Sequence, residues 1–500
     1  MTLSPLRLRL LLASLLTVSF LGALDHTIVS TSLATIAGEL GALGQMSWVI
    51  VAYTLAATVF LPLLGKLADS LGARRVFLGS LALFVLASVA CGLAQDMTQL
   101  VIARVAQGLS SAGIQLMSQT IVATVTSPRE RPRLLSIIGA AFPVAILVGP
   151  VLGGIITDHF GWQWVFWINV PFGVVALGFA VVAIPHIDGN VRGRFDVAGG
   201  VTFTTAIVSL VLAVSGVTQP GLTGVSVALL ALSAASLVAF FVIELRVDDP
   251  FVPLRYFRDR TVAAGIALSA IIGIGLFSVV SYMPTFIQMA YRTTATVSGL
   301  VPIATVFGML VSSLVTGWLS SRSGHYRVFA IFGTSVATAG LAIMALLPAG
   351  LPLWVPMAVM ALVGVGTGSF MSLVIAVVQS AVRRSETGSV TATAALVRQV
   401  GATVGTAVIG AVIGAGVLAG LPAGLDDSTL TPAVARGLSE SLQAHIAGVY
   451  GDVLRPVFAG LALVYALGII AAVLLPAGRL SDETAESESD SQPESQPQSA

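Results

Sequence analysis

The chain has 500 residues, of which 56% are hydrophobic and only 9% are charged, and its formal net charge is +1. Soluble domains carry about 25% charged residues, so this composition excludes the soluble classes and indicates an integral membrane protein. A net charge close to zero gives no electrostatic basis for binding nucleic acid. The single cysteine, Cys91, excludes an intrachain disulfide and argues against a thiolate metal site.

Apolar segments of roughly 20 residues, the length that crosses a bilayer, recur along the chain. They lie at about 8–31, 46–65, 75–94, 98–122, 134–156, 163–185, 197–217, 222–244, 262–287, 298–319, 328–348, 352–380, 389–420 and 455–476. We therefore predict an all-α polytopic membrane protein with 14 transmembrane helices. Arg7 and Arg9 precede the first segment as in a signal peptide, but its length and the spans that follow favour a first transmembrane helix.

The positive charges between the spans predict the orientation. With the N-terminus inside, most Lys and Arg residues outside the spans fall on the inner side, and only Arg292, Arg436 and Arg455 fall on the outer side. By the positive-inside rule, both termini of a multi-pass cell-membrane protein are then cytoplasmic. In the longest outer loop, about 421–454, the stretch 438–449 fits an interfacial helix. Residues 479–500 are rich in Ser, Glu, Asp, Gln and Pro, which predicts a disordered acidic cytoplasmic tail.

One short stretch occurs twice. Residues 65–77 read GKLADSLGARRVF and residues 317–329 read GWLSSRSGHYRVF, an offset of 252 (317 minus 65) that matches Gly65 with Gly317 and Gly72 with Gly324. Internal repeats are typical of secondary transporters. The offset aligns the first six spans with the last six. We therefore predict an N-terminal six-helix bundle at 1–190, two inserted transmembrane helices with linkers at 191–260, and a C-terminal six-helix bundle at 261–478.

The first copy of the repeat carries Asp69 just before the next apolar run. Its carboxylate has two candidate partners, a helix N-terminus or the guanidinium groups of Arg74 and Arg75. The simpler alternative is a cytoplasmic turn held in place by positive charge. The repeat and the spacing of the glycines and charges favour a gating loop made of Gly65, Asp69, Gly72, Arg74 and Arg75.

Motifs for ATP hydrolysis, zinc binding and serine hydrolase chemistry (G-x-x-x-x-G-K-[ST], H-E-x-x-H and G-x-S-x-G) are absent from the sequence. We therefore expect a protein that is not an enzyme, uses no cofactor and takes its driving force from an ion gradient, the proton motive force. Ionisable groups inside the spans are then the functional candidates, since they are costly in lipid.

Asp25 and Arg104 are the first such pair. Asp25 lies roughly 22 Å from the inner end of span 1, and Arg104 lies roughly 20 Å above the same face on span 4, at 1.5 Å per residue. Equal depth allows them to pair, either as a proton site or as a buried structural ion pair. Burial favours the neutral acid and a guanidinium favours the carboxylate, a balance that suits proton exchange.

Three further side chains are candidates for a substrate cavity. Gln107 follows Arg104 on span 4, and Arg398 and Gln399 lie near the middle of span 13. Arg398 either faces an anionic or carbonyl group of a substrate or binds backbone carbonyls.

Span 5 contains Gly149, Pro150, Gly153 and Gly154, a combination that bends a helix and lets neighbouring helices approach closely.

Several motifs in this order together resemble the major facilitator superfamily, and more narrowly its 14-span drug:proton antiporter branch, the EmrB/QacA type. They are the repeat at 65–77, Leu24-Asp25-x-Thr27-Ile28-Val29, Arg104-x-x-Gln107-Gly108, Gly149-Pro150-x-x-Gly153-Gly154 and Trp162-x-Trp164-x-Phe166-x-Ile168-Asn169-Val170-Pro171. The resemblance implies two pseudo-symmetric six-helix bundles plus two extra helices, alternating access, and multidrug efflux of lipophilic or cationic compounds in exchange for protons. It also implies a gating role for Asp69 and Arg75, proton coupling at Asp25 and Arg104, and an antiporter bend from Gly149 to Gly154.

The expected partners are small-molecule substrates, protons and the lipid bilayer, around a monomer. Two alternatives stay open at this stage. One is a dedicated exporter of a single metabolite or self-made antibiotic, and the other is an uncoupled channel or uniporter. Proton counterflow separates the second alternative from an antiporter.

Overall fold

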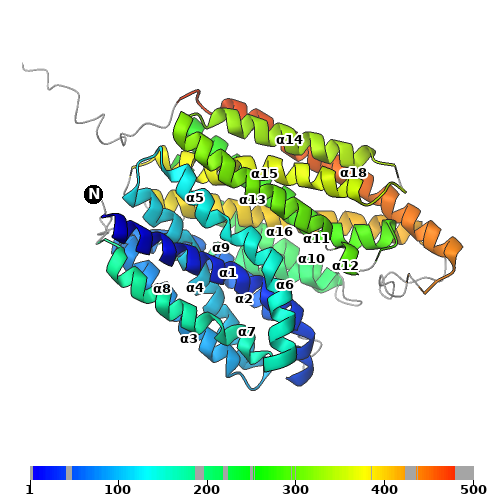
Figure 1. Cartoon of the computed structure of the whole chain (residues 1–500), viewed down its shortest axis with the longest axis horizontal. Helices are drawn as coiled ribbons and strands as arrows, with labels where there is room; N and C mark the ends of the chain where they lie inside the picture. The colour runs from blue at the N-terminus through cyan, green and yellow to red at the C-terminus, as the bar shows by residue number, and fades with distance from the viewer. Residues whose placement is uncertain are drawn as a thin grey trace, which may run out of the picture.

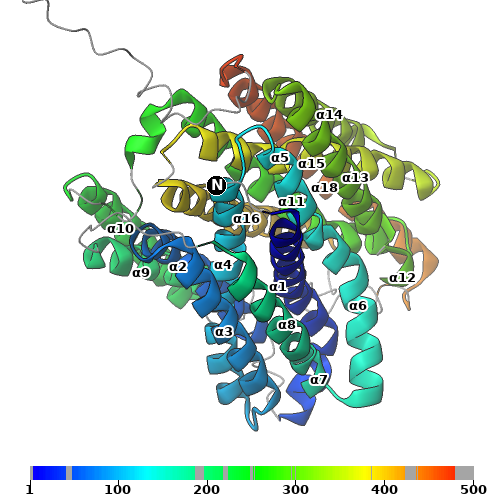
Figure 2. The same ribbon diagram turned by 60° about the vertical axis from the view of Figure 1, so that its left-hand side comes forward.

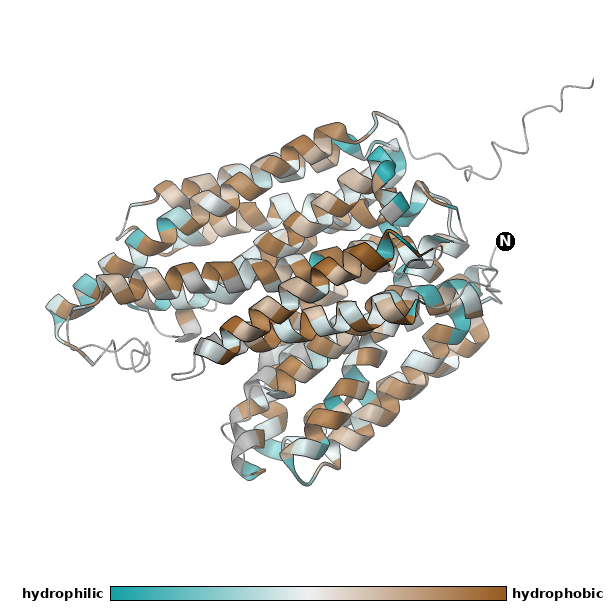
Figure 3. Cartoon of the chain, turned by 180° about the vertical axis from the view of Figure 1, so that it is seen from behind, coloured by the Kyte–Doolittle hydropathy of each residue, from teal (hydrophilic) through white to brown (hydrophobic). Residues whose placement is uncertain are grey.

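The computed structural model describes residues 4–40, 48–185, 196–217, 223–247, 250, 252, 254–293, 295–298, 300–348, 350–383, 386–422, 435 and 437–478. Long helices run side by side across the molecule (Figure 1). The N-terminal end of α1 and the C-terminal end of α18 lie at the same side of it. We call this the terminus side. Apolar residues recur along the length of the helices (Figure 3), and many of the large apolar side chains are exposed, as a lipid-facing protein requires.

The first half of the chain forms one bundle of helices. Its elements are α1 (Pro5–Glu39), α2 (Trp48–Leu71), α3 (Ala73–Gly92), α4 (Met97–Val125), α5 (Arg131–Gly139), α6 (Ala141–Phe160), α7 (Gln163–Trp167) and α8 (Asn169–Ala183). Their apolar faces meet in buried clusters that include Leu15, Phe77 and Phe84 toward the terminus side, and Trp162 and Phe166 toward the opposite side.

The second half forms another bundle. Its elements are α11 (Arg260–Ala290), α12 (Ala295–Ser298), α13 (Leu300–Ser323), α14 (Arg327–Leu346), α15 (Trp354–Ser380), α16 (Thr387–Gly420) and α18 (Glu440–Leu474). Tyr465, Phe370 and Phe458 belong to its buried core. Between the bundles in sequence are α9 (Val197–Val217), α10 (Thr223–Glu244) and the short 3-10 helix η2 (Leu254–Arg258).

The inserted pair α9 and α10 lies at one edge of the molecule beside α2 (Figure 2). Phe203 of α9 and Phe240 of α10 place their ring centroids 5.4 Å apart. Both rings belong to a cluster with Val59 of α2 and Leu396 of α16, so the insert packs where the two bundles meet. Residues 191–195 and 479–500, which include the predicted acidic tail, lie outside the described residues.

The predicted spans match the helices in position. Among the described residues, thirteen helices or helix pairs are long and apolar enough to cross a membrane, and the segment predicted at 197–217 corresponds to α9, whose described apolar part is Val197–Ala213. Two predicted spans are each divided into two helices, at Ala140 between α5 and α6 and at Ile168 between α7 and α8. The stretch 438–449, predicted as an interfacial helix, is helical from Glu440 onward, and its helix α18 continues through Pro456 to Leu474.

The sequence repeat is a structural repeat. What reads as a polar loop at 65–77 is mostly helix, since α2 ends at Leu71 and α3 begins at Ala73. Gly72 alone joins them with φ 91°, and its counterpart Gly324 follows α13 with φ 72°. This backbone conformation is open to glycine because it lacks a Cβ atom. Both halves therefore turn at an equivalent glycine on the terminus side, with one residue between the helices in the first half and three, 324–326, in the second.

Candidate ion pair, gate and transport cavity

Asp25 of α1 and Arg104 of α4 form a buried ion pair. The Arg104 Nη1 lies 2.5 Å from the Asp25 Oδ2. The Arg104 side chain is 1% exposed and the Asp25 side chain is 0% exposed. The equal depths calculated from the sequence are thus confirmed as a direct contact. The pair also crosses between two helices, so it holds α1 and α4 in register.

Neutral donors complete the shell around the Asp25 carboxylate. Gln107 Nε2 and Asn169 Nδ2 both donate to Asp25 Oδ1, at 2.8 and 2.9 Å. Gln107 Oε1 accepts from Arg104 Nη1 at 2.7 Å, and Arg104 Nε donates to the Val49 carbonyl at 3.1 Å. The Asp25 carboxylate is thus surrounded by one charged donor, Arg104, and two amide donors, Gln107 and Asn169. Gln107, which we expected at the substrate cavity, is fully buried in this network.

Tyr53 of α2 separates the ion pair from the space between the bundles. Its ring centroid lies 4.3 Å from the Arg104 Cζ, a cation–π contact. The Tyr53 hydroxyl lies 2.6 Å from Ser111 Oγ and 3.2 Å from the Gly22 carbonyl, within hydrogen-bond distance of both. Sequence reasoning missed Tyr53, because one Tyr in an apolar span has no local pattern that marks it. Gly108, which the sequence motif did contain, allows this approach, since a Cβ there would meet the Tyr53 carbonyl.

Asp69 joins the two halves of the chain on the terminus side. Its carboxylate accepts hydrogen bonds from the backbone N–H and the hydroxyl of Ser389, in the first turn of α16. Of the two partners predicted for Asp69, the helix N-terminus is therefore the one observed. The N-terminus belongs to the opposite half of the chain, which no local sequence pattern could show.

The repeated glycines make the same kind of contact between halves. A Cβ on Gly65 of α2 would lie 2.6 Å from the Ala392 Cβ on α16. A Cβ on Gly317 of α13 would lie 2.8 Å from the Pro132 carbonyl on α5. Each half thus presents a glycine that lets it cross closely over a helix of the other half.

Further hydrogen bonds close the terminus side. Arg129, between α4 and α5, donates to the carbonyls of Ser321 and Arg322 at the end of α13, at 3.1 and 2.8 Å. These are carbonyls that a helix C-terminus leaves unpaired and that attract positive charge. Gln379 of α15 donates to the Gln119 carbonyl of α4 at 3.2 Å.

The described hydrogen bonds of Asp69 include neither Arg74 nor Arg75, the other charged residues of the predicted gating loop. Arg74 Nη2 donates to the Val181 carbonyl of α8 at 2.8 Å, within the first bundle, and Arg75 is exposed. The linker before α11 instead approaches the gate. Lys66 Nζ donates to the Pro250 carbonyl at 3.2 Å, and Arg255 pairs with Glu386, the residue before α16, at 2.5 Å.

The glycines predicted to bend span 5 lie inside α6, which runs as one helix from Ala141 to Phe160 and includes Pro150, Gly153 and Gly154. A Cβ on Gly149 would meet the Thr27 side chain of α1, so this glycine sets a close contact between α1 and α6. The Thr27 hydroxyl donates to the Ala145 carbonyl at 3.1 Å beside it. The bend itself stays a prediction.

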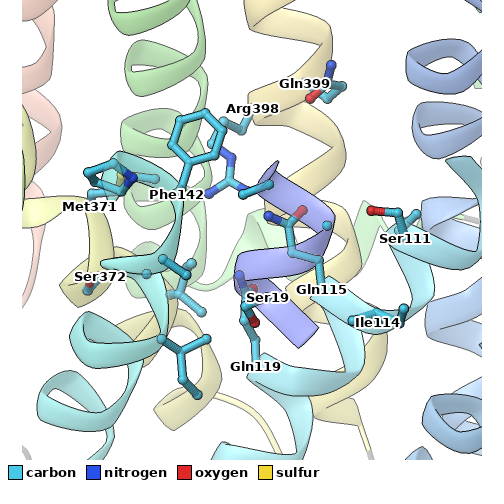
Figure 4. Close-up of a pocket in the computed structure, with 18 of the residues that line it drawn as sticks. Ser19, Ser111, Ile114, Gln115, Gln119, Phe142, Met371, Ser372, Arg398 and Gln399 are labelled. Atoms are coloured by element: carbon cyan, nitrogen blue, oxygen red, sulfur yellow. The ribbon is translucent and has the colours of Figure 1, made fainter. Parts of the chain in front are cut away.

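A cavity of about 210 Å³ lies between the two bundles. Its lining comes from α1, α2, α4, α5 and α6 of the first half and from α11, α13, α15 and α16 of the second. Arg398 and Gln399, predicted as cavity residues, both line it, as do Tyr53 and Ser111 (Figure 4 shows Ser111, Arg398 and Gln399). Most other lining side chains are apolar, which suits a lipophilic molecule.

The family model of the Major Facilitator Superfamily matches residues 15–406, more than three quarters of the chain. The chain belongs to the Major Facilitator Superfamily. Two solved structures share its fold. They are the human organic anion transporter MFSD10 (TM-score 0.60, 14% identity, 93% of this chain and 99% of that one) and the proton:xylose symporter XylE (TM-score 0.59, 13% identity, 96% and 98%).

Curated relatives of this superfamily member are similar over most of its length. An uncharacterized MFS-type transporter of Mycobacterium tuberculosis is 32% identical over 488 residues, which are 96% of this chain and 71% of the relative. The multidrug transporter protein MdtP of Bacillus subtilis is 31% identical over 76% of this chain and 71% of its own. Efflux pump FUS6 of Gibberella moniliformis is 31% identical over 73% and 66%. The chain is therefore a multi-pass membrane protein of a transporter family, and this family consists of carriers rather than enzymes.

Proposed function

We propose that this chain is a proton-coupled antiporter that exports small lipophilic molecules by alternating access. The observation that carries the proposal is the Asp25–Arg104 pair, a titratable carboxylate buried behind the wall of a cavity that both bundles share. An ionisable pair at this depth of the membrane is energetically costly, and such residues commonly serve as proton-binding sites in transporters. The names of relatives such as the multidrug transporter protein MdtP support multidrug efflux, and with it antibiotic resistance, as the physiological role.

Tyr53 connects the proton site to the cavity in this proposal. The Tyr53 ring lies on Arg104, and the Tyr53 hydroxyl binds Ser111 at the cavity wall. A proton that binds Asp25 neutralises the carboxylate that pairs with Arg104. The Arg104 guanidinium is then held less tightly, and the Tyr53 ring that packs on it can move. Loss of that proton restores the pair. Substrate entry and proton release are then coupled through the position of one aromatic side chain.

The contacts between the bundles describe one state of the transport cycle. Asp69, Arg129 and Gln379 all join the halves on the terminus side. With both termini in the cytoplasm, as the charge distribution predicts for a monomer in the cell membrane, this state is closed to the cytoplasm. Opening toward the cytoplasm then requires the Asp69 and Arg129 contacts to break, which makes the terminus side the inner gate.

A vesicle assay tests the proposed function. The purified full-length chain is reconstituted, a pH gradient is imposed, and a panel of lipophilic dyes and drugs is followed as the gradient is formed and collapsed. We expect uphill movement of at least one compound that stops when an ionophore collapses the gradient, together with counterflow of protons. Movement that only runs downhill and ignores the gradient would indicate an uncoupled carrier instead.

A further inference from the structure

The cavity contains one charged side chain among its described lining residues, the guanidinium of Arg398 on α16. The described salt bridges join Arg104, Arg255 and Arg455 to carboxylates, and neither these nor the described hydrogen bonds include Arg398. A cation at this depth of a span needs a partner or a polar cavity in front of it. Arg398 lines the cavity, and none of the described salt bridges pairs it with a carboxylate.

The backbone at Arg398 is fixed by close helix packing. A Cβ on Gly273 of α11 would meet the Arg398 carbonyl, and a Cβ on Gly401 would lie 2.8 Å from the Ala270 carbonyl. These glycines bring α11 and α16 into contact at Arg398 and at Gly401, about one turn further along α16. The guanidinium is therefore presented from a rigid part of the second bundle.

Uncharged polar groups surround the same space. Gln115 and Gln119 of α4 point into the cavity from the first bundle, opposite Arg398 (Figure 4). Ser19 of α1 also lines the cavity, and its buried hydroxyl has no hydrogen-bond partner among the described residues. Amide N–H and hydroxyl groups donate to anionic oxygens and so complement a guanidinium.

The rest of the lining suits an apolar body. Phe142 of α6 and Phe277 of α11 face each other across the bundles with ring centroids 6.4 Å apart. Met309 and Met371 line the cavity as well, and methionine adapts to ligands of irregular shape. A ligand that fits has a lipophilic portion and a polar end.

The charges decide which polar end fits. Among the described lining residues, none carries a carboxylate, and Asp25 lies behind Tyr53 with both oxygens already bonded to Arg104, Gln107 and Asn169. A cationic ligand would meet Arg398 without any counter-charge. We propose that the cavity binds amphipathic organic anions, with the carboxylate or sulfonate group on Arg398 and the apolar body against Phe142. This inference rests on the proposed export function, and it replaces the lipophilic or cationic substrates implied by the sequence resemblance with lipophilic anions.

Binding to three matched probes tests the inference without any gradient. Naphthoate, naphthylmethanol and naphthylmethylammonium share one ring system and differ in charge, and equilibrium dialysis against the purified full-length protein gives their affinities at neutral pH. We expect naphthoate to bind most tightly. Arg398→Gln, which keeps a polar side chain without the charge, weakens naphthoate binding about tenfold or more and changes naphthylmethanol binding less than twofold. Arg398→Lys retains most of the naphthoate affinity.

Arg246→Gln is the matched control, since it removes an exposed arginine at the end of α10 and should change none of the three affinities. Three results would overturn the inference: no binding of naphthoate, tighter binding of the ammonium probe, or equal losses of affinity for the acid and the alcohol in Arg398→Gln.

Transport measurements distinguish failure of the anion site from failure of the proposed function. Naphthoate that binds through Arg398 but is not moved by a pH gradient would contradict proton-coupled export alone. A gradient-driven cation whose transport ignores Arg398→Gln would contradict the anion site alone.

Discussion

Asp69 on α2 and Ser389 on α16 are 320 residues apart in the chain, yet the Asp69 carboxylate accepts hydrogen bonds from both the backbone N–H and the hydroxyl of Ser389. Ser389 lies in the first turn of α16, where unpaired N–H groups and the helix dipole favour a negative charge. Since α2 and α16 belong to opposite bundles, this contact links the two parts that move relative to each other in the proposed alternating-access cycle. It must break each time the terminus side opens.

Asp69→Asn tests the role of this contact. Asn keeps the size of the side chain but loses the charge, and hydrogen bonds to charged groups contribute about 1.5–3 kcal/mol. We expect gradient-driven transport to fall about tenfold at an unchanged amount of membrane-inserted protein. Ser70→Ala is the control, because the neighbouring Ser70 hydroxyl donates only within its own helix, to the Leu67 carbonyl. Normal turnover of Asp69→Asn would leave Asp69 as a turn residue without a gating role.

Gly65→Ala perturbs the same crossing by size rather than charge. The new Cβ would lie 2.6 Å from the Ala392 Cβ and 3.2 Å from the Gly388 carbonyl, so α2 and α16 must separate. Spin labels on the terminus-side ends of α2 and α16 should report a longer average distance. Gly79→Ala is the matched control, since no described atom lies within 4 Å of its Cβ position and alanine favours the helix by up to about 1 kcal/mol. An unchanged distance in Gly65→Ala would show that the crossing tolerates the methyl group.

The sequence predicted the order and level of the helices better than the contacts between them. Hydrophobic length located the spans, and counting 1.5 Å per residue along α1 and α4 placed Asp25 and Arg104 at one depth. The depth of a residue in the membrane depends only on its position along its own helix, so it can be calculated from the sequence. The 13-residue repeat was also confirmed in the structure, since Gly72 and Gly324 both follow a helix with a positive φ.

Side-chain contacts between helices, within a bundle or between the two bundles, could not be predicted in this way. Ser389 as the partner of Asp69, Asn169 as a ligand of Asp25, and Tyr53 above Arg104 all depend on how helices far apart in sequence rotate toward one another. Rotation about the helix axis leaves no trace in hydropathy when a span is apolar on every side. The motif glycines were visible, but which neighbour each glycine admits was not.

Arg104→Gln tests how much the ion pair stabilises the fold. Removing one partner of a buried pair leaves the other uncompensated and costs about 3–5 kcal/mol. We expect a clearly lower melting temperature in detergent for Arg104→Gln. The double variant Arg104→Gln with Asp25→Asn should recover part of the loss, because no unpaired charge then remains. A single variant as stable as the unaltered protein would mean that Asp25 is neutral when Arg104 is absent.

Cysteine labelling tests the predicted orientation. Gln95 lies exposed between α3 and α4 on the side opposite the termini, and Ser70 lies exposed at the terminus-side end of α2. In intact cells a membrane-impermeant maleimide should label Gln95→Cys, and it should label Ser70→Cys only after permeabilisation. The unaltered chain is the control, since Cys91 is buried. Labelling of Ser70→Cys from outside the cell would reverse the assigned orientation.

The most direct test of proton-coupled export is uphill transport by Asp25→Asn. Asn keeps the shape of the Asp25 side chain and one of its two acceptor oxygens, but it cannot bind or release a proton at the pH values of the assay. The assay compares unaltered and variant protein in proteoliposomes with an acidic solution on the outer face, and measures uphill accumulation beside gradient-free exchange of labelled substrate. We predict that Asp25→Asn abolishes pH-driven accumulation and keeps measurable exchange. Undiminished uphill transport by Asp25→Asn would contradict it, and the Asp25–Arg104 pair would then be a structural element of the first bundle.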